Sequence, residues 1–387
     1  MVCILSFPLD RDRRPDRRSP ELYACVMTST SGTSGSQLTG RVDDHGGWPA
    51  ILNIVGDGKD LTREQASAAM ASVLAGEATN AQLGGLILAL RVKGESVDEM
   101  EGLATGMLEA AEPLDLPADA IDIVGTGGSA YRRKSALNVS TMASFLCAAA
   151  GATVCKHGNY KASSTSGSFD LLSALGVQVE LSGTQLPACV AETGLGFALA
   201  RSFHPAMRHA GPVRAELGVP TVFNVLGPLA HPGQLGRQVL GTAAPELAER
   251  MAHVRHRMGS VNTWVVAGAD SLDELSTSGE NHVWVATPEG VEHRSVVASD
   301  VGVPMIQSLD ELGGGDARAN LDIFHAMAAG AQSPARDIVV LNAAAGLVVS
   351  GTTETLEAGV QAATDAIDDG RLADKIAQVA GWRTPDV

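Results

Sequence analysis

Between residues 48 and 111, apolar residues recur every three or four positions, the spacing that brings them onto one face of an α-helix. The pattern restarts several times and predicts four short helices. Three of the predicted starts have a hydroxyl residue followed three positions later by Gln or Glu, a pairing that satisfies free backbone N–H groups at a helix N-terminus. The pairs are Thr62 with Gln65, Thr79 with Gln82, and Ser96 with Glu99.

The pattern changes after Pro117, where short β-branched runs alternate with helical segments. This alternation is typical of a mostly parallel sheet with helices on its faces. The predicted strands are residues 121–124, 153–156, 197–200, 263–267, 283–286 and 291–297. The predicted helices are residues 142–150, 168–175, 186–192, 206–217, 245–257, 319–329 and 334–348. The fold class is therefore α/β, with a small all-helical domain followed by a large α/β domain.

The first 45 residues do not share either pattern. They carry six arginines and six acidic residues, and residues 28–38 are almost all Ser, Thr and Gly. We expect a disordered leader here. A signal peptide is not expected, because the short apolar run at residues 3–7 precedes the basic residues instead of following them.

Composition narrows the possible functions. The chain has 387 residues, 45% of them hydrophobic, and a net charge of −16, which argues against a broad nucleic-acid-binding surface. No apolar run reaches the ~18 residues that cross a bilayer, so no membrane association is expected. The five cysteines are odd in number and include no zinc-like pair, which fits a reducing, cytoplasmic setting.

A glycine-rich turn follows the predicted strand 121–124. It consists of Gly125, Thr126, Gly127 and Gly128, and a backbone without Cβ atoms can bring its N–H groups close to a phosphate. A dinucleotide-binding domain would need a helix directly at these glycines and an acidic residue at the end of the next strand. Instead the next strand ends in Lys156, which disfavours that alternative.

Two further polar turns precede predicted helices. Asn138, Ser140 and Thr141 come before one of them, where helix capping would explain one polar residue and an anion site would explain all three. The second turn spans residues 162–168. Parallel strands end at the same edge of a sheet, so these turns and Lys156 can hold a diphosphate between them.

Two charged groups in the second half of the chain are candidate ligands. Asp273 and Glu274 are adjacent in the loop after the strand 263–267, and Mg²⁺ is usually held by one or two carboxylates together with substrate phosphates. A solvated surface loop is the alternative for this pair. Arg214 lies among several cations of the predicted helix 206–217 and either binds a carboxylate with its planar fork or lies exposed.

Taken together, these segments resemble the anthranilate phosphoribosyltransferase family, a group of glycosyltransferases related to the pyrimidine nucleoside phosphorylases. Eight short motifs occur in the family's order, over about residues 48–350. They are Gly125 to Gly128, Asn138 with Ser140 and Thr141, Lys156 to Asn159, Ser163 to Gly167, Phe203 to Pro205, Pro212 to Arg214, Phe223 to Leu229, and Asp273 to Leu275.

The resemblance implies Mg²⁺-dependent transfer of the phosphoribosyl group of PRPP to the amine of anthranilate. PRPP would then be bound by Gly125, Thr126, Gly127, Gly128, Asn138, Ser140, Thr141, Lys156, Ser164 and Gly167. The metal would be bound by Ser140, Asp273 and Glu274. The acceptor would be bound by His157, Asn159, His204, Arg214 and Gly227.

The resemblance also implies a domain division and an oligomeric state. Residues 46–116, with part of 176–195, would form the small helical domain, and residues 117–175 and 196–387 the α/β domain. The chain would form a homodimer through the helical domain.

The chain departs from the family's motifs in two places. Ser129 and Ala130 replace the usual Asp-Gly, and residues 131–135 lengthen the same loop and bring in Arg132, Arg133 and Lys134. Tyr160 stands where an arginine is common. Two alternatives therefore stay open: transfer to another amino-benzoate, and a non-catalytic phosphate- or nucleic-acid-binding relative. The retained carboxylate pair and the acidic net charge argue against the second alternative.

Overall fold

The computed structural model describes residues 40–129, 131, 135–161 and 165–384, all within one compact unit of residues 38–387. Most of the predicted leader, with Arg132, Arg133, Lys134 and Ser164, lies outside the described residues. Residues 42–45 of the predicted leader form a short 3₁₀ helix, η1 (Val42–His45), whose Val42 is buried against the helices that follow.

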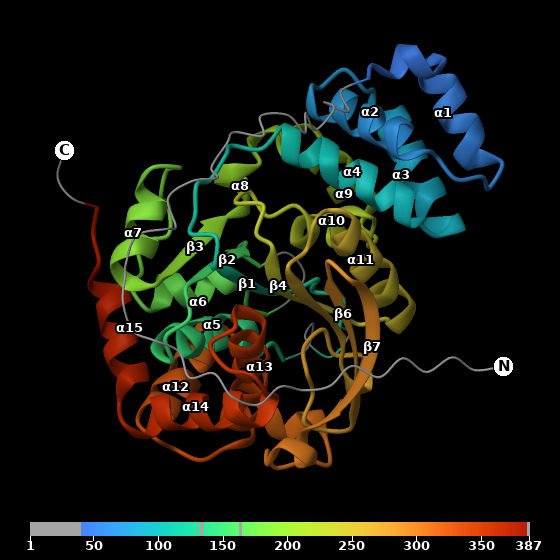
Figure 1. The fold of residues 1–387 in the computed structure, drawn as a ribbon. Helices are drawn as coiled ribbons and strands as arrows, with labels where there is room; N and C mark the ends of the chain where they lie inside the picture. Colours follow the sequence, from blue (N-terminus) through green and yellow to red (C-terminus); the bar gives the residue numbers. More distant parts are fainter. Residues whose placement is uncertain (1–39, 130, 132–134, 162–164, 385–387) are drawn as a thin grey trace, which may run out of the picture. The chain divides into compact units, whose positions relative to one another are not determined.

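The four predicted N-terminal helices are confirmed. They are α1 (Gly47–Gly56), α2 (Arg63–Leu74), α3 (Asn80–Lys93) and α4 (Val97–Glu109), drawn in blue and cyan in Figure 1. Thr62, Thr79 and Ser96 each cap the helix that they precede, and the residue three positions on returns the hydrogen bond. These reciprocal pairs account for three of the four helix starts.

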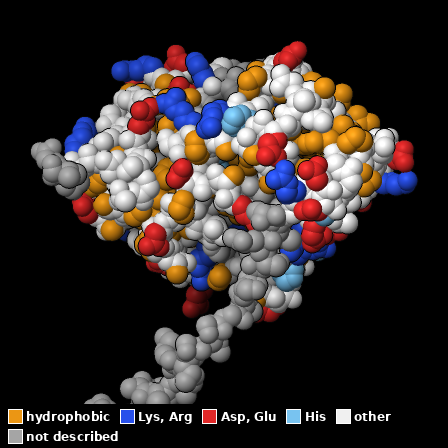
Figure 2. All heavy atoms as spheres, turned by 90° about the horizontal axis from the view of Figure 1, so that it is seen from above, with side chains coloured by type: hydrophobic (Ala, Val, Ile, Leu, Met, Phe, Trp, Pro, Cys, Tyr) orange, Lys and Arg blue, Asp and Glu red, His pale blue; other side chains and the backbone are white. Residues whose placement is uncertain are grey.

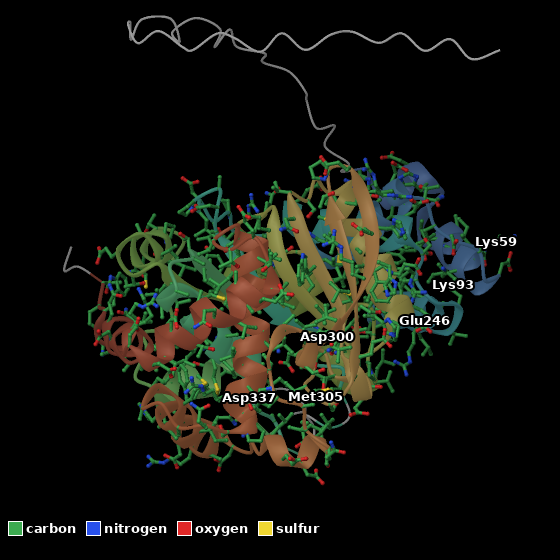
Figure 3. The ribbon with its side chains drawn as sticks, turned by 60° about the horizontal axis from the view of Figure 1, so that its bottom comes forward. Lys59, Lys93, Glu246, Asp300, Met305 and Asp337 are labelled. Atoms are coloured by element: carbon green, nitrogen blue, oxygen red, sulfur yellow. The ribbon has the colours of Figure 1, made fainter. Side chains whose placement is uncertain are left out.

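A buried carboxylate fastens α3 to α4. Glu99 is fully buried, and its Oε2 accepts hydrogen bonds from Lys93 Nζ at 2.6 Å and from the Ser96 amide at 2.8 Å. Its Oε1 accepts from the amide of Leu61 at 2.9 Å. Figure 3 shows Lys93 and Lys59 on the side of the molecule where these helices lie. Because every charge here has a partner, this polar cluster can stay inside the bundle.

A seven-stranded sheet forms the centre of the rest of the described chain, with strand order β3-β2-β1-β4-β5-β6-β7. The first five strands in this order run parallel, and β6 and β7 are antiparallel to their neighbours. The strands are β1 (Ile121–Gly125), β2 (Val154–Gly158), β3 (Leu195–Leu199), β4 (Arg237–Thr242), β5 (Asn262–Ala267), β6 (Glu280–Thr287) and β7 (Gly290–Val297). The predicted mostly parallel sheet is confirmed.

Helices cover both faces of this sheet. On one face, α5 (Val139–Ala149) and α13 (Pro334–Ser350) pack on the central strands. On the other face, α11 (Pro245–Arg257) packs on β4, β5 and β6 and also contacts α4. One hydrophobic core therefore joins this second face to the N-terminal helices, as the shared cluster of α4, α10 (Phe223–Leu229) and α11 residues indicates.

The remaining helices lie around these layers (Figure 1). They are α6 (Ser168–Ala174), α7 (Gln185–Thr193), α8 (Ala200–Phe203), α9 (Gly211–Leu217), α12 (Ala317–Ala328), α14 (Leu356–Asp368) and α15 (Arg371–Gly381). Four short 3₁₀ helices are η2 (Pro205–His209), η3 (Ala269–Ser271), η4 (Ala298–Val301) and η5 (Leu309–Leu312). In the segment 176–195, α7 contacts β3 and α15.

Two local predictions need correction. The single helix predicted over residues 206–217 is two pieces, η2 and α9, because Pro212 lacks an N–H donor and sits at the start of a new helix instead of continuing the old one. Strand β4 was not predicted at all. It contains only two consecutive large apolar residues, Val239 and Leu240, between a polar start and Gly241.

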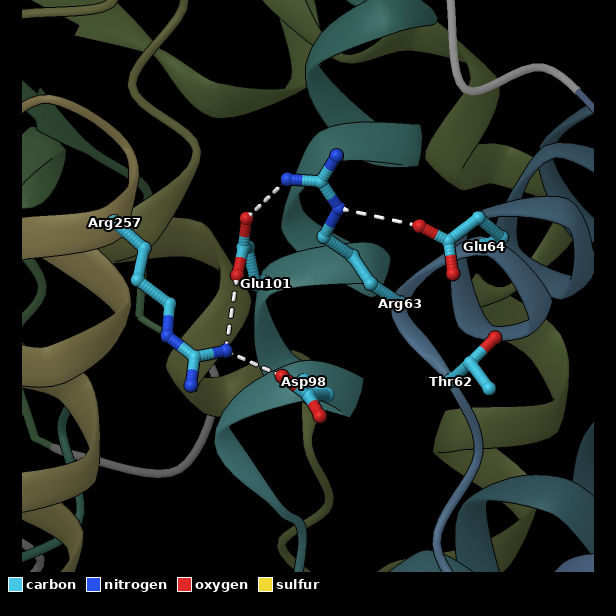
Figure 4. A pocket seen from close by; sticks show the side chains of 6 residues that line it. All are labelled: Thr62, Arg63, Glu64, Asp98, Glu101 and Arg257. Atoms are coloured by element: carbon cyan, nitrogen blue, oxygen red, sulfur yellow. Dashed lines mark hydrogen bonds and ion pairs between the residues drawn. The ribbon is translucent and has the colours of Figure 1, made fainter.

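An ion-pair network joins the N-terminal helices to α11 (Figure 4). The buried carboxylate of Glu101 on α4 lies 2.6 Å from Arg63 Nη1 and 3.5 Å from Arg257 Nη1. Arg257, on α11, also pairs with Asp98 on α4. These groups line a hollow of about 500 Å³. Both arginines are paired with carboxylates of other residues in this network, so its charged groups connect α2, α4 and α11.

The surface agrees with the composition. On the face drawn in Figure 2, acidic and basic side chains are interspersed with apolar ones, without a broad basic area. In the part of the chain that the structure describes, no helix is long and apolar enough to span a membrane.

Candidate active site

A cleft of about 850 Å³ opens at the carboxyl edge of the sheet. The glycine-rich turn after β1 contributes Thr126, Gly127 and Gly128, and α9 contributes Arg214. The end of β4 and the turn after it add residues 242–244, α3 adds Arg91, and the loop after α3 adds Glu95. Glu246, labelled in Figure 3, lines the cleft at the start of α11. The cleft thus joins the predicted donor turn to the predicted acceptor arginine.

The carboxylate of Asp273 reaches this turn from the loop between β5 and β6. Its Oδ2 accepts a hydrogen bond from the amide of Gly127 at 2.6 Å. A Cβ at Gly125 would collide with the same carboxylate, and a Cβ at Gly241 would collide with the Asp273 carbonyl. Glycine is therefore required at both positions for the carboxylate loop to approach so closely.

The start of α5 meets the second polar turn. Asn138 Oδ1 accepts a hydrogen bond from the hydroxyl of Ser166 at 2.9 Å, and the Asn138 amide donates to Asn320 Oδ1 on α12 at 2.8 Å. In the first turn of α5, Ser140 is buried and the Thr141 hydroxyl has no hydrogen-bond partner among the described residues. A buried hydroxyl without a partner, beside free helix N–H groups, suits an anionic ligand.

Gly167 lies where the second polar turn folds back on the chain. A Cβ there would overlap the backbone of Lys161, and the Asp170 carboxylate accepts the amides of both residues at 2.9 Å. The turn is thus closed by its own helix, α6.

Lys156 lies buried on β2, next to β1. Its ammonium donates a hydrogen bond to the carbonyl of Ile123, close to the glycine-rich turn. Asp122 on β1 is also buried, and burial raises the pKa of its carboxyl to about 6, although the Lys156 ammonium and the His157 amide lower it. The positive charge of Lys156 partly offsets the cost of burying the Asp122 carboxylate inside the sheet.

Three buried histidines gather behind the cleft. The ring of His157 lies 5.4 Å from that of His204 and 5.6 Å from that of His231. Burial lowers the pKa of His157 well below its usual value, and the neighbouring His231 and His204 add to this. Burial also lowers the pKa of His204 to about 4 and that of His231 to about 3. All three imidazoles are therefore neutral at physiological pH.

Hydrogen bonds define the tautomers of two of them. His157 Nδ1 faces the carbonyl of Gly227 at 3.1 Å, so Nδ1 is the donor and Nε2 carries the lone pair. Nε2 of His157 has no partner in the described part of the chain. His231 Nδ1 accepts the amide of Gly233 at 3.0 Å, so its Nε2 donates to the carbonyl of Cys155 at 2.9 Å.

Two predicted acceptor residues differ in their surroundings. The guanidinium of Arg214 lies 5.1 Å from the centre of the Phe223 ring, and burial lowers its pKa, because the cleft removes much of its hydration. The described residues provide no carboxylate partner for it. Asn159 is instead exposed, and its side chain accepts the amide of the following residue, Tyr160.

Asp273 and Glu274 fit the requirements of Mg²⁺. Both are buried carboxylates, 1% and 5% exposed, and carboxylate oxygens are preferred ligands of this ion. Among the described residues, no group of three or more acidic, histidine or cysteine side chains comes together to form an all-protein metal cage. Two carboxylates in a loop that contacts the glycine-rich turn suit an ion whose remaining ligands come from a substrate.

Comparison with known proteins agrees with this arrangement. The model of the glycosyl transferase family α/β domain matches residues 117–373, and that of its helical bundle domain matches residues 49–111. The anthranilate phosphoribosyltransferase of Afipia carboxidovorans is 42% identical over 85% of this chain and 97% of its own length. That of Rhodopseudomonas palustris is 43% identical over 83% of this chain and 94% of its own length.

Solved structures give the same result. The anthranilate phosphoribosyltransferase of Thermus thermophilus superposes with a TM-score of 0.79 at 38% identity, covering 85% of this chain and 98% of that one. The Saccharomyces cerevisiae enzyme in complex with PRPP and Mg superposes with a TM-score of 0.72 at 26% identity, covering 82% of this chain and 91% of that one. The chain belongs to the anthranilate phosphoribosyltransferases of the glycosyl transferase family.

Several residues of the site were not predicted. The turn 242–244 was missed because its strand was missed. His231 follows an apolar run and gives no sequence signal of its own, and Arg250 of α11 lines the cleft in the middle of an ordinary amphipathic helix. Only the three-dimensional arrangement places these residues at the site.

Proposed function

We propose that this chain transfers the phosphoribosyl group of PRPP to the amine of anthranilate, releasing diphosphate and giving N-(5-phosphoribosyl)anthranilate, a step of tryptophan biosynthesis. The observation that carries the proposal is the single cleft lined by both the glycine-rich turn and Arg214. A donor and an acceptor bound there are close enough to react, and this proximity supplies much of the rate enhancement.

The donor side would be formed by the turns at the carboxyl edge of the sheet. The turn of Gly125, Thr126, Gly127 and Gly128 and the first turn of α5, with the hydroxyls of Ser140 and Thr141, would bind the phosphates of PRPP. Asn138, Lys156 and Gly167 would complete the site, and the predicted contact of Ser164 belongs to the same turn as Gly167. Fixed donors of this kind stabilise charge without having to reorganise during the reaction.

The acceptor side would be formed by Arg214, Gly227 and the histidines. Arg214 is the cation expected to bind the carboxylate of anthranilate, because a guanidinium binds a carboxylate through two parallel hydrogen bonds. The bond from His157 to Gly227 leaves Nε2 of His157 able to accept a hydrogen bond. His204 and Asn159 complete the predicted acceptor set. These residues would orient the amine toward C1 of the ribose. The amine nitrogen would form the new bond to C1 as the bond from C1 to diphosphate breaks, and the amine would release a proton.

We infer that Mg²⁺ is the cofactor and that Ser140, Asp273 and Glu274 bind it. The ion would neutralise charge on the departing diphosphate. The buried carboxylates support this role, since without a cation they would repel the diphosphate beside them.

We also infer a homodimer and a cytoplasmic location. Leu88 and Val92 of α3, spaced four residues apart on one face, are 45% and 81% exposed, as expected if a second copy covers them. Cys147, Cys155 and Cys189 are buried free thiols, which suits a reducing compartment.

The activity is tested by mixing purified protein with PRPP, Mg²⁺ and anthranilate, and following anthranilate fluorescence and diphosphate release together. Both signals should change at equal rates, and chelation of the metal with EDTA should abolish both. Diphosphate release only with a different amino-benzoate would retain the chemistry and change the acceptor. Absence of release from folded protein with every acceptor would contradict the proposal.

A further inference from the structure

Two buried asparagines hold the loop that carries Asp273 and Glu274. Asn281, at the start of β6, accepts hydrogen bonds through Oδ1 from the amide of Ala269 at 3.2 Å and from that of Ser276 at 2.6 Å. Its Nδ2 donates to the carbonyl of Ser276 at 2.9 Å. One side chain therefore fastens both ends of the loop, and its own exposed fraction is 0%.

Asn342 holds the middle of the loop from the opposite side. It lies on α13, and its Oδ1 accepts the amide of Leu275 at 2.9 Å while its Nδ2 donates to the Leu275 carbonyl at 2.8 Å. A second bond from Nδ2, to the carbonyl of Ile338 at 2.8 Å, fixes the amide plane. The residue next to Glu274 is thereby fastened to the long helix beneath the sheet.

The loop held in this way has an unfavourable backbone. Asp270 and Ser271 have φ angles of 56° and 58°, in the left-handed region that costs a non-glycine residue free energy. The Asp270 carboxylate accepts a hydrogen bond from the Ser278 hydroxyl at 2.7 Å. Such a conformation persists only when surrounding contacts enforce it, and the two asparagines supply such contacts.

The loop held by the two asparagines makes three close contacts that position Asp273 and Glu274. The Asp273 carbonyl packs against Gly241, the Glu274 carbonyl against Gly268, and the Asp273 carboxylate against the amide of Gly127. A loop with freedom to relax would lose these close approaches. The amide side chains thus determine where two acidic groups stand relative to the phosphate-binding turn.

We propose that Asn281 and Asn342 are positioning residues that fix the Asp273–Glu274 pair in its metal-binding place before metal and diphosphate arrive. This inference rests on the proposed function, because it presupposes that the pair binds the metal. Neither asparagine touches substrate in this account. Groups that orient metal ligands typically change metal affinity by about 10–100-fold when removed.

The test measures metal binding directly, without turnover. Mn²⁺ replaces Mg²⁺ because it also prefers oxygen ligands and its free form is counted by electron paramagnetic resonance. Titrations with PRPP present and acceptor absent would compare the wild type with Asn281→Ala, Asn342→Ala and the isosteric Asn342→Asp. We expect the Mn²⁺ dissociation constant to rise at least about tenfold in the alanine variants and less in Asn342→Asp, which keeps the oxygen that accepts from Leu275.

Amide hydrogen exchange of the ligand-free protein gives a second readout. The amide of Leu275 should exchange faster in Asn342→Ala and that of Ser276 in Asn281→Ala, because each loses the side-chain oxygen that accepts its hydrogen bond. At saturating Mg²⁺ the variants should regain most of their kcat, whereas a general loss of structure would not be rescued by metal. If the alanine variants do not fold, Asn342→Asp is measured alone. A raised Mn²⁺ dissociation constant in that variant would support the inference, and the wild-type value would overturn it.

Asn262→Ala is the matched control, because Asn262 lies at the opposite end of β5 and, among the described residues, its side chain donates hydrogen bonds only to α13 carbonyls. It should bind Mn²⁺ as the wild type does. Wild-type Mn²⁺ affinity in folded variants of both asparagines would overturn the inference. Wild-type affinity in Asp273→Asn and Glu274→Gln would instead overturn the metal role assigned under the proposed function.

Discussion

The histidine cluster is the part of the site where burial has the largest effect on ionisation. Burial lowers the pKa of His157, His204 and His231, and neighbouring histidines lower those of His157 and His231 further. In the unfolded chain each would take up a proton near pH 6.5. Their contribution to stability is therefore complete above pH 6.5 and is lost as the pH falls toward their folded-state pKa values.

The pH dependence of stability can be measured at His231, because both of its ring nitrogens make hydrogen bonds. Each histidine that stays neutral should lower the free energy of unfolding by up to about 1.4 kcal/mol for each pH unit below 6.5. Asp122 has the opposite effect, because its raised pKa of about 6 makes its contribution larger at low pH. Urea unfolding of His231→Gln should show a shallower fall than the wild type between pH 6.5 and 4.5. The exposed His293→Gln is the control, and parallel curves for wild type and His231→Gln would contradict the assignment.

Arg214 is the residue on which acceptor recognition depends in this account. Replacing it with Ala removes a charged hydrogen-bonding partner from a partly dehydrated cleft, which should cost about 1.5–3 kcal/mol of binding. Arg214→Ala should therefore raise the KM for anthranilate by about 10–100-fold and leave the KM for PRPP within about twofold. For the uncharged anthranilamide, the same substitution should raise the KM much less. Equal increases of the KM for both acceptors would contradict a contact between Arg214 and the carboxylate.

Residue types and order alone predicted part of this site. The glycines at 125, 127 and 128 and the carboxylate of Asp273 stand out in the sequence, and the structure brings Gly127 and Asp273 into contact. Asn281, Asn342 and His231 could not be found in this way. Each acts through bonds to residues far away in the chain or to the backbone, and a single polar residue at the end of an apolar run has no distinguishing pattern.

At the level of elements, α2 and α4 are packed more closely than ordinary side chains allow. A Cβ at Gly102 of α4 would overlap the carbonyl oxygen of Arg63 on α2. Gly102→Ala should therefore destabilise the protein by about 1–3 kcal/mol, despite the better helix propensity of alanine. Gly85→Ala on α3, whose new methyl would meet only Leu52 Cδ2 at 3.5 Å, should instead be neutral or stabilising by up to about 1 kcal/mol. Thermal unfolding of the two variants would compare them, and equal midpoints would contradict the close packing.

Predictions of elements succeeded where periodicity and caps agreed. The starts of the helices after Thr62, Thr79 and Ser96 were predicted correctly, because each has an amphipathic run and a capping pair. Strand β4 was missed although it is central in the sheet. Its inward-facing Gln238 bonds to Asp122 on β1 and to the Pro228 carbonyl, a tertiary reason for a polar residue that no local pattern reveals.

At the level of the molecule, the cleft lies where the N-terminal helices and the sheet meet. Arg91 of α3 and Glu95 of the loop after it line the cleft together with the turns of the sheet. The Glu101–Arg257 pair ties α4 to α11. The N-terminal helices therefore form one wall of the cleft.

The exposed apolar face of α3 is predicted to be the dimer contact. Val92→Glu would place a charge in that contact on each protomer and should raise the dimer dissociation constant at least about tenfold. Val261→Glu, at another exposed valine between α11 and β5, should leave the dissociation constant unchanged. Sedimentation equilibrium distinguishes the outcomes. A monomeric wild type, or an unchanged dimer in Val92→Glu, would contradict the predicted contact.

A competition for a limiting amount of PRPP tests most directly whether anthranilate is the acceptor. Anthranilate and its 3- and 4-amino isomers would be supplied together at equal concentration with Mg²⁺, and the products would be quantified by mass spectrometry against released diphosphate. We expect N-(5-phosphoribosyl)anthranilate as the main product, in a one-to-one ratio with diphosphate. A dominant product from another isomer, or diphosphate without any ribosylated amine, would contradict it.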